Sequence, residues 1–218
     1  MSIKPPSRQR GLSLIELIIF MVVMGIAAAV LLQVMNLASK NSADPVRRKQ
    51  ALLLAEALLE EVELARFTYC DPTDPQAATA TVTTVGPTGC SDAAHVELIN
   101  QEVVPGAVGR PYDNVSDYAS ALGVAQQSFN DASGNIADIN GVAIDTVHLA
   151  GYKATVTLNV VPAVSPLGPT GFTITSDGTA ANMNVLRITV QVTYGGGSAN
   201  ETVTLDGYRT RYAPRSVP

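Results

Sequence analysis

The most constraining feature of the sequence is an apolar run near its N-terminus. The 21 residues from Leu12 to Leu32 contain one charged side chain, Glu16, and those from Leu17 onward have no polar side chain. As a helix this run is roughly 32 Å long, which matches a bilayer hydrocarbon core of about 30 Å. We therefore expect one membrane-spanning segment.

Charge is distributed unevenly along the 218 residues. Residues 1–11 carry three basic side chains and no acidic one, whereas the remaining 207 carry 11 basic and 19 acidic side chains. The positive-inside rule therefore places residues 1–11 in the cytoplasm and the acidic body across the membrane. The sequence has no basic excess of the kind that nucleic-acid-binding proteins show, so we expect no nucleic-acid partner.

Two features of the apolar run need an explanation. A cleaved secretory signal peptide has a shorter apolar region that ends at its cleavage site. Here Ala27–Ala29 could imitate such a site, but more apolar residues follow, which disfavours that interpretation. Glu16 is the other feature, because a carboxylate inside a membrane helix costs about 3 kcal/mol unless it stays wet at the interface.

The residues around Glu16 offer a more specific explanation. Gly11–Glu16 reads Gly-Leu-Ser-Leu-Ile-Glu and directly follows the basic residues. This pattern resembles the signature of type IV prepilins, in which a short basic leader ends in Gly and Glu is the fifth mature residue. Leu12 stands where many members of the family have Phe.

The resemblance implies a processing and assembly route. A prepilin peptidase would remove residues 1–11 after Gly11, and the new amine of Leu12 would be methylated. The apolar helix would then pack with other pilins in a filament, through the pilus assembly machinery of the inner membrane. Pairing of Glu16 with an N-terminal amine, its own or a neighbour's, would offset the cost of burying its carboxylate.

A second helix is predicted from Pro45 to about Arg66. Pro45 is favoured at a first helical position, and either Ser42 or Asp44 is a good N-cap. One apolar stripe with helical spacing consists of Ala51, Leu54, Ala55, Leu58, Val62 and Ala65. This pattern favours an amphipathic helix under a sheet over a coiled-coil seam, with a break between Asn41 and Pro45.

Two segments narrow the resemblance. Residues 44–62 and 111–118 are similar to the MshD-type minor pilins of the mannose-sensitive haemagglutinin (MSHA) pilus system. The second segment resembles their acidic loop, with Tyr112, Asn114 and Ser116 in place of the usual residues. The likeness implies an inner-membrane protein of a Gram-negative bacterium, with its body in the periplasm and later in a pilus at the cell surface. Asp113 and Asp117 would form a turn network or contact a neighbouring subunit.

The body gives weaker signals up to residue 150, where we expect loops, short strands and a short helix around 115–125. Cys70 and Cys90 favour a structural disulfide over a reactive or metal-binding thiol pair, because oxidation is permitted outside the cytoplasm. Alternating residues predict strands at 152–160 and 185–194, and the second of these forms a hairpin with 201–205. Residues 172–175 could add a strand. The arginines of the tail, Arg209, Arg211 and Arg215, are expected to be solvated.

The sequence contains no motif that indicates catalysis. His95 and His148 lie 53 residues apart without zinc-protease spacing, so we interpret them as surface or structural residues. The segment 130–135 is turn-like but lacks the spacing of an EF-hand, and a metal at Asp113, Asp117 or Asp131 is disfavoured. We therefore predict no enzyme, no cofactor and no metal site.

These observations predict an α+β, pilin-like fold, with a long N-terminal helix packed on a C-terminal antiparallel sheet. The expected divisions are a leader at 1–11, a transmembrane and filament-core helix at 12–35, an amphipathic helix at 36–67 and a β-rich head at 68–218. The predicted function is that of a minor type IV pilin in pilus biogenesis. A pseudopilin of a type II secretion system is the alternative, and a membrane-tethered carbohydrate-binding or hydrolytic module is a further one.

Overall fold

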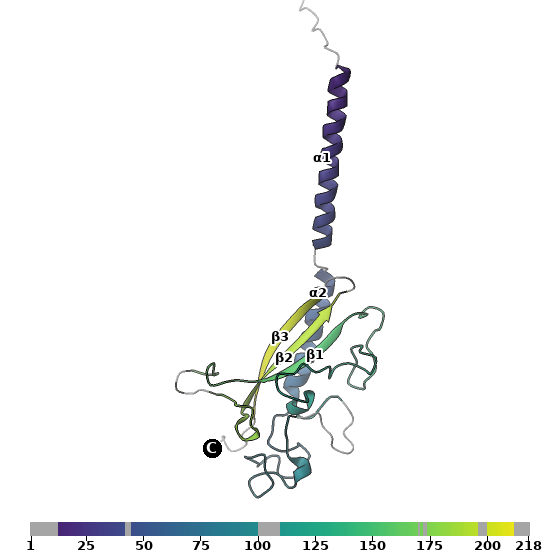
Figure 1. Cartoon of the computed structure of the whole chain (residues 1–218). Coiled ribbons are helices and arrows are strands. Elements are labelled where there is room, and N and C mark those ends of the chain that lie inside the picture. Colours follow the sequence, from purple (N-terminus) through teal and green to yellow (C-terminus); the bar gives the residue numbers. More distant parts are fainter. Residues whose placement is uncertain are drawn as a thin grey trace, which may run out of the picture. The chain divides into compact units, whose positions relative to one another are not determined.

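The computed structural model describes residues 13–41, 45–99, 110–169, 171, 174–195 and 200–211. The chain forms two compact units, Met1–Pro45 and Val46–Pro218. Helix α1 spans Leu14–Asn41, and helix α2 spans Pro45–Leu64 (Figure 1). The helices therefore end and begin at the two residues between which a break is expected. The candidate caps Ser42 and Asp44 lie outside the described residues.

Three antiparallel strands form the sheet of the second unit, in the order β1-β2-β3 (Figure 1). They are β1 Lys153–Val160, β2 Val185–Tyr194 and β3 Glu201–Thr210. The register places Val156 opposite Val190 and Val190 opposite Leu205, so the alternating apolar residues share one face. The predicted α+β class and the two predicted strands are confirmed, and β3 extends beyond Leu205 to Thr210.

The core of this unit lies between α2 and the apolar face of the sheet. Four helix residues at helical spacing are buried, and they join the same core as the inward side chains of the strands: Ala51, Ala55, Leu58 and Val62. Alanines on the buried stripe let the helix approach the strands closely. A Cβ on Gly207 of β3 would clash with Glu63 Oε1 and lie 3.0 Å from Leu59 Cδ1, so glycine leaves room for these two side chains of α2.

The segment between α2 and the sheet contains mostly turns. A 3₁₀ helix, η2 at Val115–Tyr118, lies at the start of the region where a short helix is expected around 115–125. It ends because Ala119 is extended and Gly123 has φ +74°, which is incompatible with a continuous helix. In the region expected as a further strand, Ile174 forms an isolated bridge to Leu167, and residues 172 and 173 lie outside the described part of the chain.

The expectation of a solvated arginine tail is wrong for Arg211. Its guanidinium carbon lies 4.7 Å from the ring centre of Phe67 and 4.4 Å from that of Tyr69. It also donates a hydrogen bond to the Ala180 carbonyl oxygen at 2.8 Å. The end of β3 places this cation against aromatic residues that follow α2, and such cation–π contacts stabilise by about 0.5–2 kcal/mol. Arg215 lies outside the described residues.

Two alanines on α2 test how closely the helix packs. Ala55 is fully buried in the core, whereas Ala57 faces solvent. We expect Ala55→Leu to lower the free energy of unfolding by about 1–3 kcal/mol, because added methylenes force side chains and backbone apart. Ala57→Leu is the matched control and should change it by less than about 0.5 kcal/mol. Denaturant unfolding in detergent, followed by tyrosine circular dichroism, measures both; equal effects would refute this account of the core.

Candidate functional site

Helix α1 presents an apolar surface that the described residues leave exposed. Leu14–Asn36 has a mean hydropathy of 2.8, none of it is buried, and among the described residues it is the one helix long and apolar enough to cross a membrane. Leu14 and Leu32, for example, are 79% and 68% exposed. Exposed apolar area costs about 25 cal/mol per Å² in water, so the surface requires lipid or other helices around it.

Glu16 lies in the first turn of this helix. Its backbone N–H donates to the Ser13 carbonyl oxygen at 3.1 Å and to Ser13 Oγ at 3.3 Å, so Ser13 caps the helix. A carboxylate in the first turn also interacts favourably with the positive end of the helix dipole. Gly11 and Leu12, the expected cleavage and methylation positions, lie outside the described residues, and pairing of Glu16 with an amine stays a prediction.

Cys70 and Cys90 form a disulfide that closes the segment of residues 68–97, here called the Cys loop. Asp74 lies beside it, with a carboxylate oxygen within 4.8 Å of both sulfurs. Because the sulfurs are bonded to each other, neither is a thiolate ligand for a metal. The Asp74 carboxylate instead accepts hydrogen bonds from the N–H and the hydroxyl of Ser91, both at 2.8 Å, and so holds the loop closed.

The acidic loop singled out in the sequence folds into η2. Asn114 is its N-cap, and Asp117 closes a capping box by accepting a hydrogen bond from the Asn114 N–H at 3.2 Å. Asp117 is only 3% exposed, so its side chain belongs to the turn network. Asp113 is half-buried, and its Oδ1 is a buried atom without a hydrogen-bond partner. A subunit contact through these two residues stays a prediction.

Hydrogen bonds join η2 to the Cys loop and to Arg66, two residues before the loop. Arg66 and Val115 pair through their backbones, with the Val115 N–H donating to the Arg66 carbonyl oxygen at 2.8 Å. Asn114 Nδ2 donates to Thr68 Oγ1 at 3.0 Å, and Ser116 Oγ lies 2.6 Å from Glu97 Oε1. We call this contact between the Cys loop and η2 the junction.

Glu97 is a functional candidate that sequence reasoning missed. Burial, together with the negative charges of Asp71 and Asp113, raises its pKa to about 7, although hydrogen bonds from Ser116 and Asp117 oppose the shift. No local pattern in the sequence marks Glu97, because its partners lie about 20 residues away along the chain.

A second cluster is centred on Arg110 and Glu61 of α2. The guanidinium donates to both Glu61 carboxylate oxygens, at 2.7 and 2.6 Å, and its remaining terminal nitrogen donates to the carbonyls of Phe129 and Ala137. Tyr118 also donates its hydroxyl to Glu61 at 3.0 Å. Burial and the charge of Glu61 raise the pKa of Tyr118, which keeps its hydroxyl protonated as the donor.

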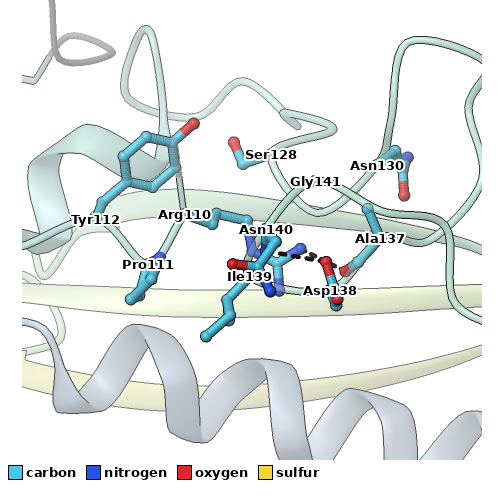
Figure 2. Close-up of a pocket in the computed structure, with 10 residues that line it drawn as sticks. All are labelled: Arg110, Pro111, Tyr112, Ser128, Asn130, Ala137, Asp138, Ile139, Asn140 and Gly141. Carbon is cyan, nitrogen blue, oxygen red and sulfur yellow. Dashed lines mark hydrogen bonds between the residues drawn. The ribbon is translucent and has the colours of Figure 1, made fainter. Parts of the chain in front are cut away.

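Figure 2 shows the pocket of about 400 Å³ next to this cluster, bounded by Tyr112 on one side and by the loop around Asp138 on the other. Arg110 points across its floor toward Ala137. Because all three guanidinium nitrogens of Arg110 are already engaged within the protein, this residue fastens the loop to α2 and leaves little capacity for a ligand.

The remaining polar residues considered in the sequence have local roles. A ring nitrogen of His95 lies 2.8 Å from the Asp92 carboxylate, and one of His148 lies 2.6 Å from that of Asp145. Asp131 accepts hydrogen bonds from the N–H groups of two residues within its own turn. The interpretation of the histidines as surface or structural residues is confirmed.

A match to a known family was found for the N-terminal segment. Residues 6–32 match the family model described as the prokaryotic N-terminal methylation motif. The match supports a type IV prepilin-like N-terminus, and therefore a pilin-like or pseudopilin-like protein with a structural role. A segment of this kind implies processing by a prepilin peptidase and anchoring in a membrane. No curated protein and no solved structure matches the chain significantly.

The Arg110–Glu61 pair is predicted to be essential for stability. We expect Arg110→Ala to lower the free energy of unfolding by about 3–5 kcal/mol, because Glu61 would lose its charged partner and keep only the Tyr118 hydroxyl. Adding Glu61→Ala should cost less than the sum of the single changes. Arg187→Ala, on the exposed face of β2, is the control. Denaturant titrations of the four variants measure the coupling, and additive effects would contradict a direct interaction.

Proposed function

We propose that this chain is a minor type IV pilin of the MshD type that takes part in pilus biogenesis. In this proposal, residues 1–11 are its leader, prepilin peptidase cleaves after Gly11, and the amine of Leu12 is methylated. The chain is first held in the inner membrane of a Gram-negative bacterium with its body in the periplasm. It then enters the pilus through contacts with other pilins.

The observation that carries the proposal is the methylation motif over residues 6–32 together with the nature of α1. Its segment Leu14–Asn36 is predominantly apolar, and none of it is buried among the described residues. Such a helix is stable in lipid, and it is equally stable in a bundle of similar helices, so one segment serves for both membrane storage and filament assembly. The acid at its first turn then needs a cationic partner in the bundle.

The MshD assignment within the family rests on residues 44–62 and 111–118. The latter segment forms η2 and contributes to the buried junction, and it connects to α2 through the Arg66–Val115 pairing. A distinctive loop at such a position suits a specialised subunit present in few copies. A pseudopilin of a type II secretion system shares the same N-terminal segment, so the experiment must separate pilus formation from protein export. Deleting the gene should abolish MSHA-type pili and leave secreted enzymes unaffected; the reverse would establish the pseudopilin role.

The cleavage site gives a direct prediction. Gly11→Val should leave residues 1–11 attached, because a side chain at the last leader position obstructs the peptidase. Gly25→Ala is the matched control, since a Cβ there meets no atom within 4 Å. Mass spectrometry of the purified protein should find Met1 at the N-terminus of Gly11→Val and methylated Leu12 in the wild type and the control. Normal processing of Gly11→Val would refute the assigned cleavage site.

A second prediction concerns the acid of the first turn. Glu16→Ala should still insert into the membrane, because it removes a polar group that lipid disfavours. It should be incorporated into pili at least tenfold less, because an N-terminal amine loses its partner in the helix bundle. Immunoblots of membrane and sheared-pilus fractions measure both quantities, with the exposed Glu60→Gln as control. Unchanged incorporation of Glu16→Ala would count against the pairing.

A further inference from the structure

The junction between the Cys loop and η2 requires a proton on a carboxyl group. Thr68 donates its one hydroxyl proton to the Cys70 carbonyl oxygen at 2.7 Å, so it can only accept from Asn114 Nδ2. This fixes the orientation of the Asn114 amide, and its Oδ1 faces Ser116 as an acceptor.

The Ser116 hydroxyl faces two oxygen atoms but has only one proton to donate. It lies 2.9 Å from Asn114 Oδ1 and 2.6 Å from Glu97 Oε1. Both contacts are hydrogen bonds only if Ser116 donates to Asn114 while Glu97 donates to Ser116. Glu97 can donate only when its carboxyl group is protonated.

The burial of Glu97 and Asp117 agrees with the proton count at Ser116. The two carboxyl groups interact with each other, and both residues are more than nine-tenths buried. Two carboxylates in such contact cannot both be ionised at low cost, so the pair holds a proton. The pKa of about 7 for Glu97 agrees with this count.

The charges around the pair favour retention of the proton. Asp71, from the Cys loop, and Asp113, from the segment before η2, both raise the pKa of Glu97. The negative charge of Glu97 raises the pKa of Arg211, which follows β3. The positive charge of Arg66 lowers the pKa of Asp113. Burial lowers the pKa of Arg211, and its guanidinium is engaged with two aromatic rings, so it does not neutralise the acids by direct pairing.

We propose that the junction is a pH-sensitive switch, in which the Glu97–Asp117 pair holds one proton while the Cys loop is docked on η2 and releases the loop when that proton is lost. On ionisation, the Ser116 hydroxyl turns from Asn114 to Glu97. Asn114 Oδ1 then keeps only its 3.4 Å contact with the Ser116 N–H, and the cap of η2 weakens. Uncompensated negative charge at the junction separates the two segments.

The direction of the pH effect follows from the raised pKa. The docked state binds more protons than the open state between the ordinary pKa of a glutamate, about 4.3, and about 7. The opening constant of the Cys loop therefore rises by up to about tenfold for each pH unit in this window and levels off above it. The contribution of this proton to docking is complete below about pH 4.3 and is lost progressively as the pH rises to about 7.

The decisive test is a carboxyl titration of the full chain in detergent micelles with a chelator present. With ¹³C-labelled Glu and Asp side chains, NMR should detect one carboxyl group that titrates near pH 7 in the wild type and is absent in Glu97→Gln. Asp113→Asn should lower this midpoint by removing a neighbouring negative charge. If no carboxyl group of the wild type titrates above about pH 6, the proposal is wrong, whether or not the variants fold.

Hydrogen exchange tests the consequence for the loop. Between about pH 5.5 and pH 8, after correction for intrinsic rates, exchange in the Cys loop should accelerate at least tenfold in the wild type relative to β2. Glu97→Gln mimics the protonated acid and should remove this dependence, whereas the exposed Glu60→Gln should retain it. His95 also has a raised pKa, so its contribution is subtracted by comparing variant with wild type. Equal pH dependence in wild type and Glu97→Gln would overturn the switch.

Discussion

The organisation of this protein depends on the apolar surface of α1. A helix of 28 residues whose described side chains are all exposed, most of them apolar, is unstable in water. Its surroundings must therefore provide the apolar contacts. Lipid and a bundle of like helices both satisfy this requirement. In the proposed function the helix moves from the first environment to the second, and Glu16, the one charged residue of the apolar run, would favour the bundle if it meets an amine there.

The second unit, in contrast to α1, buries a hydrophobic core of its own. Helix α2 contributes alanines and medium-sized aliphatic residues to a shared core with the sheet, and Gly207 leaves space for the helix above β3. The long segment between helix and sheet has few regular elements. It is held instead by a disulfide, by Arg110 on Glu61 and by Arg211 between two rings. Each of these interactions joins segments that are distant in the sequence.

The difference between local patterns and contacts between distant segments explains what the sequence could predict. The first helix follows from an uninterrupted apolar run, and the second helix and the first two strands follow from periodic patterns; all are local features of ten to thirty residues. The Cys70–Cys90 pair was accessible because two cysteines allow one pairing. Arg211 was misjudged and Arg110 and Glu97 were overlooked, because their roles depend on partners 19 to 49 residues away or more, brought together only by the fold. Asp117 was identified from its loop, although its burial was not.

The buried acids of the junction illustrate why such groups are retained. Replacing a buried polar network by apolar residues is often neutral or stabilising, so stability alone does not explain Glu97, Asp117 and Ser116. A network that needs one exchangeable proton has two states whose balance depends on pH, which an apolar contact cannot provide. The Val115 N–H of η2 also donates to the carbonyl oxygen of Arg66, two residues beyond the end of α2, so the junction lies next to the helix that contributes to the core. A polar junction thus trades stability for a conformational response located at one edge of the body.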